Sequence, residues 1–288
     1  MTDVDFLSNN FYTIPNNFVG GIKMKLSICV VDHNNSILVE KTWENEVFLA
    51  YRNAFEPGDK IKITSSEVGV FLFLTVASCV VPSLVYLTEH ETYYQIPFGD
   101  DRKVFPPHSF DGERHYIHVR VARPEEVYRR RNLALNPAAT HCFSGMYPFA
   151  SANVETRGEM VFAAKNAIDG VVANDNHGKW PYTSWGINRD PEAALKLEFG
   201  RDILADELVV YLRADFPHDA WWESADVHFS DGTSMQLSLK KTHEAQRFTF
   251  PTKRISWLVI DTLIKADDPS PFPALTQLEV WGTEVEND

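Results

Sequence analysis

Cysteine is scarce in this chain, and the few cysteines form no recognisable motif. Only three of the 288 residues are cysteine, namely Cys29, Cys79 and Cys142, and no CxxC spacing occurs. This excludes the usual cysteine-based zinc and redox motifs. Free thiols indicate a reducing compartment, and the N-terminus has neither the basic segment nor the apolar core of a secretory signal. We therefore expect a cytoplasmic protein.

Basic residues are also in short supply. The chain has 27 Lys and Arg residues against 40 Asp and Glu residues, which gives a net charge of −13. A nucleic-acid-binding surface needs a surplus of Lys and Arg to neutralise phosphates, and an anionic membrane attracts the same residues. We therefore expect neither nucleic acid nor a membrane as a partner.

Long apolar runs and catalytic fingerprints are lacking as well. The longest apolar stretch is VGVFLFLTVASCVVPSLVYL, and Thr75, Ser78, Pro82 and Ser83 interrupt it. Its β-branched and aromatic residues predict two buried strands rather than a membrane-spanning helix. The sequence also has no GxSxG motif, P-loop or Rossmann fingerprint, so nothing in it points to a common enzyme class.

Short alternating runs fill the chain instead of helical periodicity. Examples are GIKMKLSICVVD, DKIKITSS and GVFLFLTV in the first half and LKLEFG, DELVVYLRA and ADVHFSDGTSMQLSL in the second. Gly, Pro, Asn and Asp bound these runs, which is typical of an all-β protein. We predict two β-sandwich domains.

A charged segment, ARPEEVYRRRNL, separates the two β-rich halves. We place an N-terminal β-sandwich of unassigned role at residues 1–125, a linker at 126–131 and the C-terminal domain at 132–288. The loop at residues 92–110 is rich in Tyr, Phe and Pro. This composition indicates an interface, either with the second domain or with another subunit.

Several short motifs of the second half occur in a characteristic order. They are NLALNP, ANV, AKNAIDGVVAN, W…SWG, LKLEFG, LVVYLRAD, ISWLVIDT and LTQLEVWGTE. Together, over about residues 132–284, they resemble the discoidin-like domains of the coagulation factor five/eight type C superfamily, which includes many bacterial carbohydrate-binding modules. The resemblance implies a galactose-binding-like jelly roll. Because such domains share a fold more than a ligand, the site has to be argued from its residues.

The resemblance also implies a structural calcium ion. In that family a turn like AIDG often helps to hold calcium with carbonyl groups, an aspartate and a glutamate near the last strand. Asp169 matches the aspartate, but Gln277 stands where the glutamate is expected, so the site has one anionic ligand fewer. A turn capped by Asp169 is the alternative. We expect no other cofactor.

Strand parity places the long loops of the second half together. Successive strands of a sandwich run in alternate directions, so successive connections lie at alternate ends. With strands at 194–199 and 207–212, the loops 171–190, 213–224 and 265–274 lie at one end. Clustered loops on a rigid sandwich usually carry the binding site.

The side chains of these loops suit a sugar. Aromatic rings stack on the face of a sugar ring, while Asp, Arg and His side chains hydrogen-bond its hydroxyl groups. Trp180 and Trp221 are the stacking candidates, whereas Trp185 and Trp222 are expected to be core residues. The polar candidates, two of them from the neighbouring segment NVETRGE, are Glu155, Arg157, His177, Arg213, Asp215, His218 and Asp219.

These polar residues have structural alternatives. Arg213 with Asp215 is also compatible with a buried ion pair that fixes the loop, and His218 with Asp219 with a pair that stabilises a turn. A zinc or iron site would use His177 and His218, but the short HxH or HExxH spacing of such sites is missing.

We favour a non-catalytic carbohydrate-binding protein. Two alternatives stay open: a glycoside-hydrolase-type enzyme that uses carboxylates of the same loops as acid and base, and a structural or protein-interaction module. A homo-oligomer also stays open. No carboxylate is marked by an apolar setting that would raise its pKa, so the enzyme is the weaker alternative.

Overall fold

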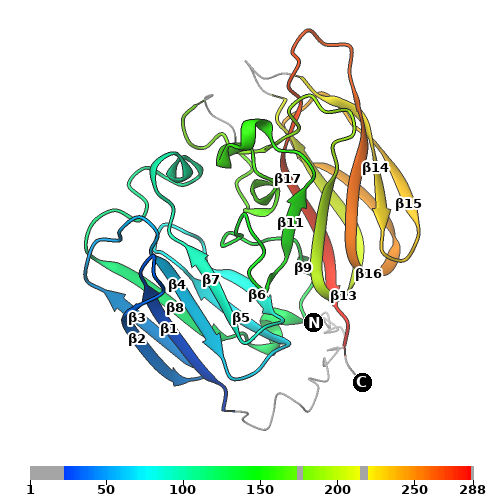
Figure 1. The fold of residues 1–288 in the computed structure, drawn as a ribbon. Coiled ribbons are helices and arrows are strands. Elements are labelled where there is room, and N and C mark those ends of the chain that lie inside the picture. Colours follow the sequence, from blue (N-terminus) through cyan, green and yellow to red (C-terminus); the bar gives the residue numbers. More distant parts are fainter. Residues whose placement is uncertain (1–22, 174–177, 215–219, 287–288) are drawn as a thin grey trace, which may run out of the picture.

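The computed structural model describes residues 23–173, 178–214 and 220–286, and its regular structure is almost entirely β (Figure 1). One group of strands comes from the first half of the chain and a second group from the second half. The all-β class predicted from alternating runs is thereby confirmed. In the described residues no helix is long and apolar enough to span a membrane.

The first half forms two antiparallel sheets. The four-stranded sheet has the order β2-β1-β4-β7 and consists of β1 (Lys25–Val31), β2 (Ile37–Glu44), β4 (Lys60–Ser65) and β7 (Glu91–Gln95). The five-stranded sheet has the order β10-β6-β5-β8-β3 and consists of β3 (Glu46–Tyr51), β5 (Val70–Thr75), β6 (Ser83–Leu87), β8 (His115–Val121) and β10 (Met146–Tyr147).

These two sheets bury the apolar residues that the alternating pattern predicts. In β4 every second residue is buried, so that Ile61 and Ile63 belong to one core with Leu72 of β5 and Ile117 of β8. Met146 of β10 joins the same core although it follows the predicted linker. The domain limits proposed from the sequence therefore stay a proposal.

The second half forms one large antiparallel sheet that rolls into a sandwich. Its order is β12-β17-β13-β16-β14-β15, with β11 paired to β13 and β9 paired to β17. The strands are β9 (Arg131–Asn132), β11 (Phe149–Ala152), β12 (Trp185–Gly186), β13 (Leu195–Leu212), β14 (Trp222–Phe229), β15 (Ser234–Ser238), β16 (Gln246–Lys265) and β17 (Ala274–Glu284).

β13 differs from the expected pair of separate strands. The predicted strands 194–199 and 207–212 are parts of one long strand, and the expected link at 200–206 is a bend with two irregularities in register. Such bulges let a strand turn a corner while its ladder continues. Gly200 lies at this bend with φ +71°, and a Cβ atom there would come within 2.4 Å of the Tyr147 ring. Only glycine therefore fits.

Short helices lie in the connections between strands. They are η2 (Gly99–Val104), α1 (Pro124–Val127), η3 (Thr156–Gly158), η4 (Met160–Phe162) and η5 (Ala164–Ile168). Val104 of η2 is buried in a small cluster with Val161, Phe162 and Tyr182 of the second half. The loop at 92–110 thus forms an interface with the second half, one of the two partners expected from its composition.

Candidate functional site

The long loops of the second half do meet at one end of its sandwich. Leu212 at the end of β13 pairs with Leu275 at the start of β17, and Trp222 at the start of β14 pairs with Lys265 at the end of β16. Trp185 of β12 also pairs with Leu275 and packs on Trp222, with ring centroids 6.4 Å apart. The parity prediction is therefore correct for the connections that leave these strands, and we call this region the loop end.

A small hollow lies at the loop end. Its volume is about 170 Å³, and the residues that matter for its chemistry are Thr156, Arg157, Asn188, Arg189, Arg213 and Phe272. They come from η3, the segment after β12, the end of β13 and the segment before β17. We call it the loop-end hollow.

Three non-glycine residues of this hollow have a left-handed backbone. Arg157 has φ +56°, Asn188 φ +51° and Arg189 φ +63°. Non-glycine residues adopt such values rarely and at an energetic cost, so the surrounding structure has to hold them. The Thr156 hydroxyl does part of this, because it accepts a hydrogen bond from the backbone N–H of Asn188 at 3.0 Å.

The three arginines are held in different ways. Arg157 makes a two-pronged hydrogen bond to Glu159, at 2.6 and 2.8 Å, which lowers the pKa of the Glu159 carboxyl group. The guanidinium of Arg189 lies 4.2 Å from the ring centroid of Phe272. Arg213 is buried, with its guanidinium 5.7 Å from the ring of Tyr182. Each of the three guanidinium groups therefore has a partner within the chain.

Only part of the predicted site is brought together here. Arg157 and Arg213 line the hollow, as expected. Glu155 points elsewhere: one of its oxygens lies 2.7 Å from Nε2 of His141, and the other accepts the backbone N–H of Ala164 at 2.8 Å. Both carboxylate oxygens of Glu155 therefore have partners within the chain, which gives it a structural role.

The tryptophans divide between core and surface. Trp185 and Trp222 are fully buried, as predicted. Trp221 is half-buried and packs against the same core. Trp180 lines a separate hollow with Arg102 and other residues of the first half. Neither Trp180 nor Trp221 lines the loop-end hollow, so the stacking role of both stays a prediction.

Four predicted ligand residues, His177, Asp215, His218 and Asp219, lie outside the described residues. Their roles stay predictions.

The surroundings of Asp169 do not fit a calcium ion. Its Oδ1 accepts the backbone N–H of Val171 at 2.8 Å, and Gln277 Oε1 accepts that of Gly170 at 3.1 Å. Burial raises the pKa of Asp169 to about 7, opposed by the nearby Lys165 ammonium. A hard cation needs several anionic or carbonyl oxygens, not one carboxyl beside an ammonium. Among the described residues no group of three His, Cys, Asp or Glu side chains forms a metal site.

Three residues of the hollow were missed in the sequence. Asn188, Arg189 and Phe272 all lie in loops that parity placed at the loop end. Their position in those loops could have identified them. The left-handed backbone of Asn188 and Arg189, however, cannot be predicted from an Asn-Arg pair in the sequence. Phe272 was the easiest of the three to find from the sequence, because an aromatic residue between two prolines stands out in a loop.

No protein-family model and no curated protein matches this chain. Among solved structures, a His 62 mutant of the lectin-binding domain of lectinolysin, complexed with Lewis b, is 16% identical. The match covers 54% of this chain and 99% of that one, with a TM-score of 0.41. A family 32 carbohydrate-binding module from C. perfringens NanJ, in complex with galactose, is 18% identical over 46% of this chain and 91% of that one, with a TM-score of 0.36.

A Streptococcus pneumoniae fucose-binding module, SpX-3, is 12% identical over 54% of this chain and 99% of that one, with a TM-score of 0.37. The chain is thus similar to solved carbohydrate-binding domains. At these identities and TM-scores the likeness concerns the fold alone, and the ligands named belong to those proteins.

Proposed function

We propose that the protein binds carbohydrate without converting it, and that the loop-end hollow is its glycan site. The observation that carries the proposal is the gathering of three left-handed, non-glycine residues, Arg157, Asn188 and Arg189, around one hollow. Backbone strain of this kind persists where the fold holds residues in place for a task, and it clusters at ligand sites.

The donors of the hollow suit sugar hydroxyl groups. Guanidinium groups donate several hydrogen bonds in a fixed plane, and an Asn amide both donates and accepts. Phe272 is 37% exposed and offers an apolar ring beside these donors. A small volume of about 170 Å³ suits a single terminal sugar rather than a long chain. His177, Asp215, His218, Asp219 and Trp221 belong to the same proposal as further ligand residues.

Binding is proposed rather than hydrolysis because of the charges of the hollow. Glycoside hydrolysis uses two carboxyl groups that flank the scissile bond. In the described part of the chain, the residues that line the loop-end hollow include arginines but no Asp or Glu. These described residues can hold a sugar, whereas a pair of acid and base would have to come from Asp215 and Asp219.

A glycan array followed by calorimetry tests the proposal. We expect one or more neutral sugars to bind, and Phe272→Ala to weaken that binding roughly 10-fold or more, as the loss of an aromatic contact does. Trp43→Ala is the matched control, since Trp43 is an aromatic residue of the first half that is 68% exposed. Equal affinity in both variants and the wild type would place the glycan site elsewhere.

A further inference from the structure

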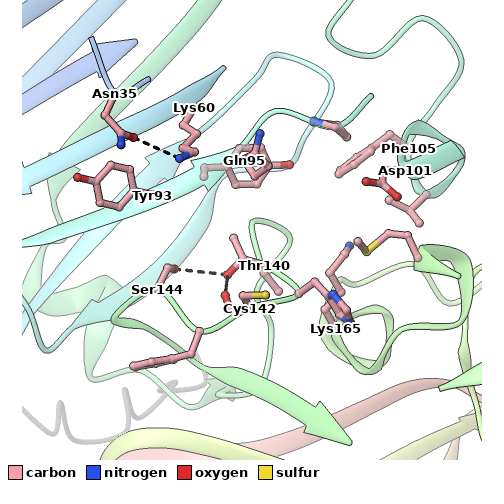
Figure 2. Close-up of a pocket in the computed structure, with 17 residues that line it drawn as sticks. Asn35, Lys60, Tyr93, Gln95, Asp101, Phe105, Thr140, Cys142, Ser144 and Lys165 are labelled. Atoms are coloured by element: carbon pink, nitrogen blue, oxygen red, sulfur yellow. Dashed lines mark hydrogen bonds between the residues drawn. The ribbon is translucent and has the colours of Figure 1, made fainter. Parts of the chain in front are cut away.

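A large cleft lies between the two halves in the described part of the chain, away from the loop-end hollow. Its volume is about 680 Å³, within the range of sites that enclose small organic molecules. One wall comes from β7 and η2 of the first half, and the other from the segment 139–144 and η5 of the second half (Figure 2). We call it the interdomain cleft.

A buried lysine faces this cleft. Lys165 of η5 lines it and is only 8% exposed. Among the described residues its ammonium makes no hydrogen bond and no ion pair within 4 Å. It lies 5.5 Å from the centroid of the Phe105 ring, and the Asp169 carboxyl group attracts it from a longer distance. Burial lowers the pKa of Lys165, while the carboxyl groups of Asp169, Asp101 and Glu155 act in the opposite direction. A buried cation without a paired anion is costly.

Two other basic side chains of the cleft, Lys60 and His141, already have partners. At the far end, Lys60 donates a hydrogen bond to Asn35 Oδ1 at 3.2 Å, as Figure 2 shows. His141, which also lines the cleft, lies 2.7 Å from Glu155 Oε2. Lys165 is therefore the group in the cleft that would gain most from a bound anion.

The charge of that anion is limited by the cleft itself. Asp101 of η2 lines the same end of the cleft as Lys165, on the opposite wall (Figure 2). A dianion such as phosphate would leave a negative charge uncompensated next to Asp101, since one lysine neutralises only one charge. A carboxylate, with a single charge, matches Lys165.

The side chains of the cleft walls suit a ligand that contains a ring. Tyr93 and Phe105 present aromatic rings to the cleft, which suit the flat face of a ring. On the opposite wall, the Ser144 hydroxyl accepts a hydrogen bond from Thr92 at 3.1 Å and lies 3.4 Å from the Thr140 hydroxyl, so these hydroxyl groups bond one another (Figure 2). Thr140 lies beside it and donates to the Cys142 carbonyl oxygen at 2.8 Å.

We propose that the interdomain cleft is a second ligand site, which takes a ring-bodied organic monocarboxylate such as a uronic acid, with its carboxylate on Lys165. The ligand carboxylate would form a direct ion pair with this ammonium, which the more distant Asp169 carboxyl group does not. This site does not rest on the loop-end hollow, and it stands whether or not that hollow binds a glycan.

Calorimetric titration of the full chain tests this site. The probes are glucuronate, galacturonate, benzoate and cyclohexanecarboxylate, with glucose and inorganic phosphate as controls. We expect at least one carboxylate to bind more tightly than both controls. Lys165→Met should weaken that binding roughly 10- to 100-fold, the usual effect of losing a charged hydrogen bond.

Three further variants predict stronger, unchanged and unchanged carboxylate binding, respectively. Asp101→Asn should strengthen carboxylate binding several-fold, because it removes a negative charge that repels the ligand carboxylate at the Lys165 end of the cleft. Lys60→Met is the matched control and should change the affinity little, since Lys60 lies at the far end. Phe272→Ala, at the loop-end hollow, should leave carboxylate binding unchanged, so that the two proposals fail separately.

The proposal is overturned by any of three results. These are a Kd above about 10 mM for all four carboxylates, tighter binding of glucose or phosphate than of any carboxylate, and unchanged affinity in a folded Lys165→Met variant. If Lys165→Met does not fold, the Asp101→Asn result decides, and unchanged or weaker binding there contradicts the proposal.

Discussion

Two places between the halves hold buried cations, and they differ in what neutralises the charge. At the first, Glu284 of β17 bonds both Arg131 and Arg201, with 2.7 Å from Arg201 Nε to Glu284 Oε2. The Arg201 guanidinium also lies 4.6 Å from the ring of Phe71 in the first half. At the second place Lys165 is buried, but no carboxylate of the described chain lies within ion-pair distance of its ammonium, and Asp169 attracts it only from farther away.

The presence or absence of a direct carboxylate partner distinguishes charged side chains with a structural role from one that is available to a ligand. The arginines and Glu284 form a closed group whose members satisfy one another, so it holds β13, β17 and the first half together. Lys165 makes no such group, although it lines a cavity large enough for a ligand. Burial alone does not distinguish the two roles, whereas the presence of a partner does.

The largest expected effect comes from breaking the closed group. Glu284→Gln leaves the two buried arginines without their anion, so the free energy of unfolding should fall by about 3–5 kcal/mol. Urea denaturation at neutral pH measures it. The control is Glu223→Gln, an exposed glutamate on β14, which should change stability by less than about 0.5 kcal/mol. Similar losses in the two variants would mean that the group is not structural.

A less buried pair should show an intermediate effect that depends on pH. Arg120 of β8 binds Glu126 of α1 through two hydrogen bonds, at 2.6 and 2.7 Å, and lowers the pKa of Glu126 to about 2. A lowered carboxyl pKa contributes stability that is complete above the unfolded value of about 4.3 and is lost as the pH falls toward 2.

Glu126→Gln tests that pair. The variant should be less stable than the wild type by roughly 1–2 kcal/mol at pH 6, a figure reduced for partial exposure, and the gap should shrink as the pH falls from 4.5 toward 2. Urea denaturation at a series of pH values measures the gap. A gap that stays constant over this range would show that the pair does not act through the Glu126 charge.

The smallest effect on stability is expected at Lys165. Lys165→Met replaces an unpaired buried ammonium with an apolar chain of similar length, so stability should stay the same or rise by up to about 1 kcal/mol. Thermal melting without ligand measures the change. A loss of about 2 kcal/mol or more would mean that the ammonium has a structural partner after all, and the contrast with Glu284 would disappear.

The sequence contained most of the fold and part of the candidate site. Alternation predicted the sheets, because a half-buried strand needs an apolar residue at every second position, and parity placed Arg213 and Phe272 at the same end. The bend in β13 escaped prediction because bulges depend on packing such as that of Gly200 on Tyr147. Lys165 escaped for a different reason: its cleft exists only once Tyr93 and Phe105 of the first half lie opposite it.

One paired titration tests most directly whether the molecule has two separate ligand sites. A neutral sugar identified on the array and the tightest-binding carboxylate are titrated into the wild type, Phe272→Ala and Lys165→Met. We predict that Phe272→Ala weakens only the sugar and Lys165→Met weakens only the carboxylate, each roughly 10-fold or more. If each folded variant weakens both ligands equally, or neither variant weakens any, the account of two sites is contradicted.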